Sequence, residues 1–199
     1  MLASEREKLF DPKREYVSIG ISDGGVCYSV TPVMWENTAS AFNMKTPELF
    51  IAPEDLLDRE IFDRICSLQV LGLYVYTSLD DYRFISHFHD LRDLHVRCCA
   101  KLCDLDFLSD LTDLGMLFLE GASLRDVDVI WEVKASGRGF MPYRQVGLFD
   151  CNIDRAPKVD VEKQGFTEFL VWSRAENSAR DRELWKDVAA FTKKYYTIK

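Results

Sequence analysis

A leucine-rich pattern recurs along this chain with a period of 22 to 23 residues. Each copy has mostly apolar residues at its first, fourth and sixth positions. The six copies begin at Thr46, Leu68, Leu91, Leu114, Tyr143 and Phe166, so successive steps are 22, 23, 23, 29 and 23 residues. A fixed period in this range is typical of a solenoid, in which each repeat buries its apolar face only against neighbouring repeats.

Within each copy, apolar and variable residues alternate, which predicts a short strand with one buried face. The predicted strands are neighbours in one curved parallel sheet and cover residues 49–51, 70–73, 93–96, 116–119, 145–148 and 168–171. A second apolar segment follows each strand and is predicted to return to the next one as a helix or a 3₁₀ turn. These return segments cover residues 61–65, 84–88, 107–111 and 130–133.

The ends of a solenoid expose apolar core and need caps. The predicted division is an N-terminal cap at residues 1–45, the solenoid at 46–175 and a C-terminal capping helix at 176–199. The N-terminal cap is expected to be a hairpin, because two apolar segments flank the turn sequence Ser22-Asp-Gly-Gly25. The C-terminal helix is expected because Ser178-Ala-Arg-Asp181 reads as a capping box before apolar residues at helical spacing.

Two copies extend the pattern beyond the strand. One reads Tyr143-x-x-Val146-x-Leu148-x-x-Cys151-x-Ile153, and the preceding copy differs from it in having Ala122 where Cys151 stands. On these residues the chain resembles the leucine-rich repeat family, with a stretch at 102–114 similar to the short bacterial repeats of internalins. The resemblance covers about residues 46–175 and implies an α/β solenoid. It places Cys99 and Cys151 at the family's Asn/Cys position, and Tyr76, Ala122 and Arg174 there in other copies, so that turn is expected to be irregular.

The charge balance restricts the partners. The chain has 25 basic and 33 acidic residues, a net charge of -8, which argues against nucleic acid or an anionic membrane as the main partner and permits a basic protein. No signal peptide and no apolar run of about 20 residues is visible in the sequence. The six cysteines show no regular disulfide framework. A cytoplasmic location is therefore expected.

The variable positions of each strand are expected to face an open concave surface. They are rich in aromatic residues and include an arginine, the composition of interface hot spots. The candidate partner-binding residues are Tyr74, His95, Arg97, Phe118, Glu120, Phe149 and Trp172. Arg97 and Glu120 are predicted to pair across adjacent strands, and loss of Phe149 or Trp172 to weaken binding with little effect on stability. The alternative is that these residues contact the caps or a second copy of the chain.

Histidines and cysteines also cluster in the segment 87–103. They are His87, His89, His95, Cys98, Cys99 and Cys103, and their spacing matches no compact zinc motif. Alternation along the strand also sets His95 and Cys98 on opposite faces, which disfavours a Cys/His dyad. Cys66, Cys99 and Cys151 lie on the apolar phase of the repeat, so we expect buried, reduced thiols with raised pKa values. Neither a metal nor a cofactor is expected.

Taken together, these features predict a non-catalytic protein–protein interaction module that binds a protein partner on its concave sheet face. One alternative is a bacterial immunity-type inhibitor that masks a basic toxin. Another is a metal- or thiol-dependent enzyme built on the Cys/His segment 87–103. No nucleophile elbow, zinc-protease motif or phosphate loop occurs in the sequence, which favours the binding module.

Overall fold

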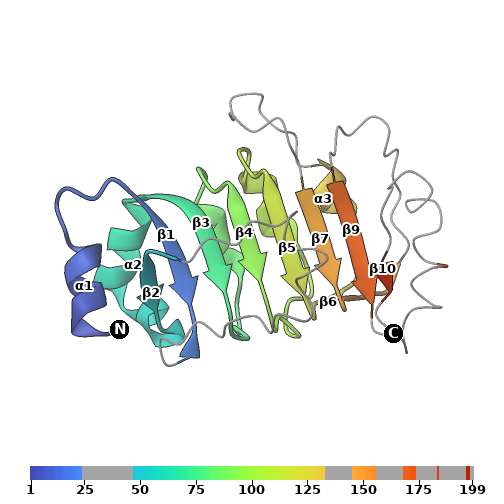
Figure 1. The fold of residues 1–199 in the computed structure, drawn as a ribbon, viewed down its shortest axis with the longest axis horizontal. Helices are drawn as coiled ribbons and strands as arrows, with labels where there is room; N and C mark the ends of the chain where they lie inside the picture. Colours follow the sequence, from blue (N-terminus) through green and yellow to red (C-terminus); the bar gives the residue numbers. More distant parts are fainter. Residues whose placement is uncertain (24–46, 133–144, 156–167, 174–182, 184–195, 198–199) are drawn as a thin grey trace.

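A parallel β-sheet dominates the computed structural model, which describes residues 1–23, 47–132, 145–155, 168–173, 183 and 196–197 (Figure 1). The eight strands follow the order β10-β9-β7-β5-β4-β3-β1-β2, and every neighbouring pair is parallel. Few helices accompany the sheet, so the chain is of the α/β class. Figure 1 shows the strands side by side along the long axis of the molecule.

The strands of the main sheet are β1 (Tyr16–Ile21), β2 (Leu49–Ile51), β3 (Gln69–Val75), β4 (Asp93–Val96), β5 (Met116–Glu120), β7 (Gln145–Phe149), β9 (Glu168–Ser173) and β10 (Tyr196–Thr197). A second sheet pairs β6 (Ser123–Leu124) with β8 (Asn152–Ile153). The helical elements are α1 (Ala3–Leu9), η3 (Pro53–Leu57), α2 (Arg59–Cys66), η4 (Arg83–His87), η5 (Asp106–Asp110) and α3 (Asp128–Glu132). All six strands predicted from the repeat are therefore present in one parallel sheet.

The core lies between the sheet and the return segments. Alternate strand residues such as Leu73, Leu94 and Leu117 point into it, and apolar residues of the return segments meet them there. In α2, Ile61 and Ile65 lie four residues apart on one helix face, and both are buried. The predicted return segments are confirmed, since α2 and α3 are α-helices and η4 and η5 are 3₁₀ helices.

The N-terminal hairpin prediction is wrong for residues 16–21, because β1 lies inside the main sheet. It pairs in parallel with β2 on one side and with β3 on the other, so β2 and β3 are not neighbours. The reason is its apolar phase. Val17, Ile19 and Ile21 alternate as the repeat strands do, and all three are buried in the same core. The second predicted hairpin segment, 26–30, lies outside the described residues.

The register of β3 also differs from the sequence prediction. Leu73, not Leu71, lies opposite Leu94, which shifts this repeat by two residues. The position expected at Tyr74 is therefore taken by Tyr76, and Ser78 stands where the other copies have Cys99 and Ala122. A shift of two keeps every side chain on its face, so the alternating pattern alone cannot detect it.

A left-handed backbone residue follows three of the strands at equivalent places. Cys98, Gly121 and Asp150 have φ angles of 54°, 77° and 50°. Each is the second residue after the end of the aligned strand segment, so the chain turns in the same way after β4, β5 and β7. This conformation favours glycine and is tolerated by aspartate.

The C-terminal prediction is only partly testable. Of the predicted helix at 176–199, the described residues are Glu183 and the pair 196–197, and the rest lies outside them. Tyr196 and Thr197 form β10, which pairs in parallel with β9. The helix prediction is therefore wrong for these two residues, which extend the sheet by one strand.

Candidate binding face and neighbouring cavity

The sheet face opposite the core carries a row of rings. Register places Tyr74, His95 and Phe118 opposite one another on β3, β4 and β5. Their ring centroids lie 4.9 Å apart for Tyr74 and His95, and 5.6 Å apart for His95 and Phe118. Phe149 continues the stack at 4.6 Å from Phe118. We call these four residues the aromatic row.

Glycines make room for the rings. A Cβ atom on Gly72 would lie 2.9 Å from the Tyr74 ring, and one on Gly20 would lie 2.7 Å from the Phe50 ring. Gly147 pairs with Phe118, so no side chain separates Phe118 from Phe149 at that place in the sheet. Small and aromatic residues on this face are thus matched to each other, and substitution of Gly20 or Gly72 would require a ring to move.

The aromatic row is buried, which differs from the open surface expected from the sequence. His95 is 1% exposed and Phe149 is 5% exposed, with Tyr74 and Phe118 as inaccessible as His95. Alternation along a strand shows which face a residue occupies but not whether that face is covered. The Trp172 side chain lies outside the described residues, although its backbone pairs with Phe149 as predicted.

His95 is the polar member of the aromatic row. Neither of its ring nitrogens has a hydrogen-bond partner in the part of the chain that the structure describes. Burial, with a smaller contribution from the nearby Arg97 cation, lowers the pKa of His95 to about 3. The ring is therefore neutral at physiological pH, and it acts on its neighbours mainly by stacking.

Arg97 and Glu120 form the predicted pair at the carboxyl ends of β4 and β5. Arg97 Nε donates to Glu120 Oε2 at 2.5 Å, and the two side chains are 17% and 24% exposed. The pair is thus half-buried rather than fully exposed, as we had expected from the sequence. One of five guanidinium N–H groups makes this bond, and Arg97 has no other hydrogen bond within the described residues.

The thiols agree with the sequence prediction in pKa and only partly in burial. Cys99 is buried, whereas Cys66 and Cys151 are half-buried. Burial raises the pKa of all three thiols, for Cys151 to about 12. The Cys99 thiol donates to the Glu120 carbonyl at 3.2 Å, and the Cys151 thiol lies 3.4 Å from the Phe149 carbonyl. Ala122, between them in the sheet, has no such group, so the irregularity predicted at this turn is present.

The Cys/His segment 87–103 does not converge on one point. His95 is buried in the aromatic row, while the exposed His87 packs edge-on against Phe62 at 5.5 Å. His89 Nδ1 lies 3.4 Å from the carbonyl oxygen of Asp110. Over the described residues, no group of three or more His, Cys, Asp or Glu side chains is placed to hold a metal ion.

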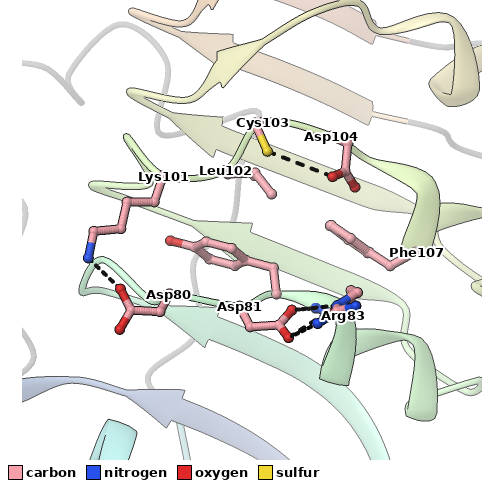
Figure 2. Close-up of a pocket in the computed structure, with 9 residues that line it drawn as sticks. Asp80, Asp81, Arg83, Lys101, Leu102, Cys103, Asp104 and Phe107 are labelled. Atoms are coloured by element: carbon pink, nitrogen blue, oxygen red, sulfur yellow. Dashed lines mark hydrogen bonds and ion pairs between the residues drawn. The ribbon is translucent and has the colours of Figure 1, made fainter.

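A surface cavity of about 290 Å³ lies where the loops after β3 and β4 meet (Figure 2). Its lining residues are Asp80, Asp81, Tyr82, Arg83, Lys101, Leu102, Cys103, Asp104 and Phe107. The sequence analysis did not predict this site. A signal existed, because these charged residues occupy the loops before two successive return segments, but loop charges in one sequence do not show that two loops form a cavity.

Most charges in this cavity are paired. Arg83 binds Asp81 through Nε at 3.0 Å and Nη2 at 2.6 Å, and this contact lowers the pKa of Asp81 to about 2. Lys101 pairs with Asp80. Cys103 Sγ lies 3.7 Å from the Asp104 carboxylate, a weak hydrogen bond. Opposed, solvent-exposed charges of this kind are common on protein surfaces and do not define a reaction.

Comparison of the chain with models of protein families, with curated proteins and with solved structures finds no match. The leucine-rich repeat resemblance therefore depends on the sequence pattern alone. Among the described helices, none is both long and apolar enough to cross a bilayer.

Proposed function

We propose that this chain is a non-catalytic, leucine-rich-repeat-type solenoid that binds a protein partner on the sheet face bearing the aromatic row. Three recurrences support the repeat interpretation. Successive strands from β3 onward add to one side of the sheet, return segments follow them at similar spacing, and a left-handed residue closes β4, β5 and β7. A stack of equivalent units is the simplest arrangement that yields all three.

The observation that carries the binding proposal is the Arg97–Glu120 pair beside the aromatic row. Arg97 is held in place by one short bond and keeps further N–H donors for an incoming carboxylate or carbonyl. Neighbouring residues Asp93 and Met116 are half-exposed on the same face. A fixed arginine beside packed aromatics is typical of interface hot spots. In this proposal the buried rings act as a rigid base, and the half-exposed residues make the contacts.

The enzyme alternative receives less support from the geometry. Catalytic cysteines need a lowered thiol pKa, whereas burial raises the pKa of Cys66, Cys99 and Cys151. His95 is inaccessible and lacks the orienting hydrogen bond that a general base uses. The immunity-type alternative remains a special case of partner binding, with a basic toxin as the partner. The proposed compartment is the cytoplasm.

The proposal is tested by affinity capture from the source cell with the full chain and two arginine variants. Arg97→Ala removes the arginine beside the aromatic row. Arg83→Ala is the control, because it also breaks an ion pair but lies in the cavity at the loops after β3 and β4. A partner retained by wild type and Arg83→Ala but lost with Arg97→Ala supports the proposed face. Equal capture by all three proteins, with Arg97→Ala folded by circular dichroism, would contradict it.

A further inference from the structure

The main sheet ends at β2, and the backbone geometry of this edge leaves one amide pointing outward. Ser22 on β1 donates its N–H to the Ile51 carbonyl at 3.1 Å, so Ile51 directs its backbone groups toward β1. Because backbone groups of successive strand residues point to opposite sides, Phe50 directs its N–H and C=O away from β1. An outward amide on an edge strand is the group that another strand would bind.

Glu5 of α1 occupies this amide. Its Oε2 accepts the Phe50 N–H at 2.8 Å, and its Oε1 accepts from Lys8 Nζ at 2.5 Å. Glu5 is 8% exposed. Burial raises the pKa of the carboxyl, but the hydrogen bonds from Lys8 and Phe50 outweigh it and leave the pKa below its usual value. Glu5 therefore faces the edge as a carboxylate, which is a strong acceptor for a backbone amide.

Other contacts hold α1 in this place, at the end of the molecule that carries β2 (Figure 1). Leu9 is fully buried in the core. Arg64 of α2 donates from Nε to the Leu9 carbonyl at 2.9 Å and from Nη2 to the Asp11 carbonyl at 3.1 Å. The helix is thus anchored at its C-terminal end, while Glu5 makes the contact with the edge itself.

We propose that α1 guards the β2 edge through Glu5, and that an unguarded chain pairs through β2 with a second copy of itself. Two copies related by a two-fold axis pair their edges antiparallel, and pairing centred on Phe50 places residue 48 of one copy opposite residue 52 of the other. Glu48 would then face Ala52, so no like charges oppose. Arg14 Nη1 already lies 3.3 Å from the Glu48 carboxylate and offsets its charge.

The primary test is the mass of the full chain by light scattering over a wide range of concentration. Wild type should stay at 23.0 kDa, whereas Glu5→Ala should rise with concentration toward twice that mass. Glu7→Ala is the matched control, since Glu7 is exposed on the same helix, and it should remain monomeric. Glu5→Gln retains a side-chain oxygen that accepts the Phe50 amide, so it should largely restore the monomer.

Two further measurements separate a guard from a merely structural residue. In the Glu5→Ala background, Ala52→Glu places like charges opposite Glu48 and should abolish the association, whereas Ala52→Lys should strengthen it. Hydrogen exchange at the Phe50 amide should be fast in dilute Glu5→Ala and slow in concentrated samples. If the exposed amide exchanges quickly while the protein stays monomeric, or if the amide remains protected without Glu5, the proposal is overturned.

Discussion

Replacing Gly121 by alanine is expected to destabilise the protein through its backbone alone. Gly121 has a φ of 77°, and a Cβ atom built there meets nothing within 4 Å. No side-chain clash therefore contributes to the effect. The substitution isolates the conformational cost of the turn after β5, which is the same turn that follows β4 and β7.

The expected magnitude comes from two opposing effects. An L-residue in the left-handed region costs roughly 1–2 kcal/mol. Removing glycine restricts the unfolded chain and returns about 0.4–1 kcal/mol. Gly121→Ala should therefore lower the free energy of unfolding by about 1 kcal/mol, which corresponds to a fall in Tm of roughly 2–4 °C for a chain of this size.

The equivalent position in the preceding repeat supplies a test of opposite sign. Cys98 has a φ of 54° and is exposed, so Cys98→Gly removes the left-handed penalty without leaving a cavity. The same two effects, reversed, predict a gain of about 1 kcal/mol in the free energy of unfolding. Gly121→Asn is the control, because asparagine tolerates this conformation and should be close to neutral.

Urea unfolding followed by circular dichroism measures all three variants, with an unchanged m-value as the condition for comparing them. The backbone argument requires Gly121→Ala and Cys98→Gly to move stability in opposite directions. It is refuted if Gly121→Ala is as stable as wild type, or if Cys98→Gly is destabilised.

Three further predictions concern the aromatic row and the thiols. Because the pKa of His95 is about 3 in the fold and 6.5 in the unfolded chain, the unfolded state alone gains this proton as the pH falls below 6.5, and stability declines from there toward pH 3. Between pH 7 and pH 5, wild type should lose about 2 kcal/mol more in urea unfolding than His95→Phe, and equal losses would contradict this. Phe149→Ala should lower the free energy of unfolding by about 3 kcal/mol because the ring is buried, in contrast to the small effect expected from the sequence, while the exposed-site control Leu57→Ala should change little. Thiol labelling followed by peptide mass analysis should modify exposed Cys98 in the native state and buried Cys99 only after unfolding, and early labelling of Cys99 would show that its site opens.

The strands were predictable because their signal is local. Alternation and a constant spacing place β4, β5 and β7 to within a residue, since a one-residue slip would turn every apolar side chain out of the core. The register of β3 was not predictable in the same way. Its apolar run allows two offsets that differ by two residues, and the structure has Leu73 opposite Leu94. β1 was missed as a sheet strand because it lies outside the regular spacing, although its alternation was visible.

The candidate binding face was predictable in position and not in exposure. Strand phase places Tyr74, His95 and Phe118 on the non-core face, and adjacency pairs Arg97 with Glu120. Burial depends on everything packed above that face, which no periodicity encodes. The contact between Glu5 and Phe50 spans 45 residues and depends on the backbone orientation at one edge, so a sequence pattern could not have indicated it.

The position of β1 between β2 and β3 also bears on the order in which the chain folds. Leu73 finds Leu94 after a loop of 21 residues, whereas Ile19 must find Leu73 across 54. The longer loop costs about 0.8 kcal/mol more in closure entropy, before any of its contacts form. We therefore expect β3, β4 and β5 to associate first and to present an open edge on which β1 docks later. The N-terminal end of the sheet would then be the last part to form and the first to open.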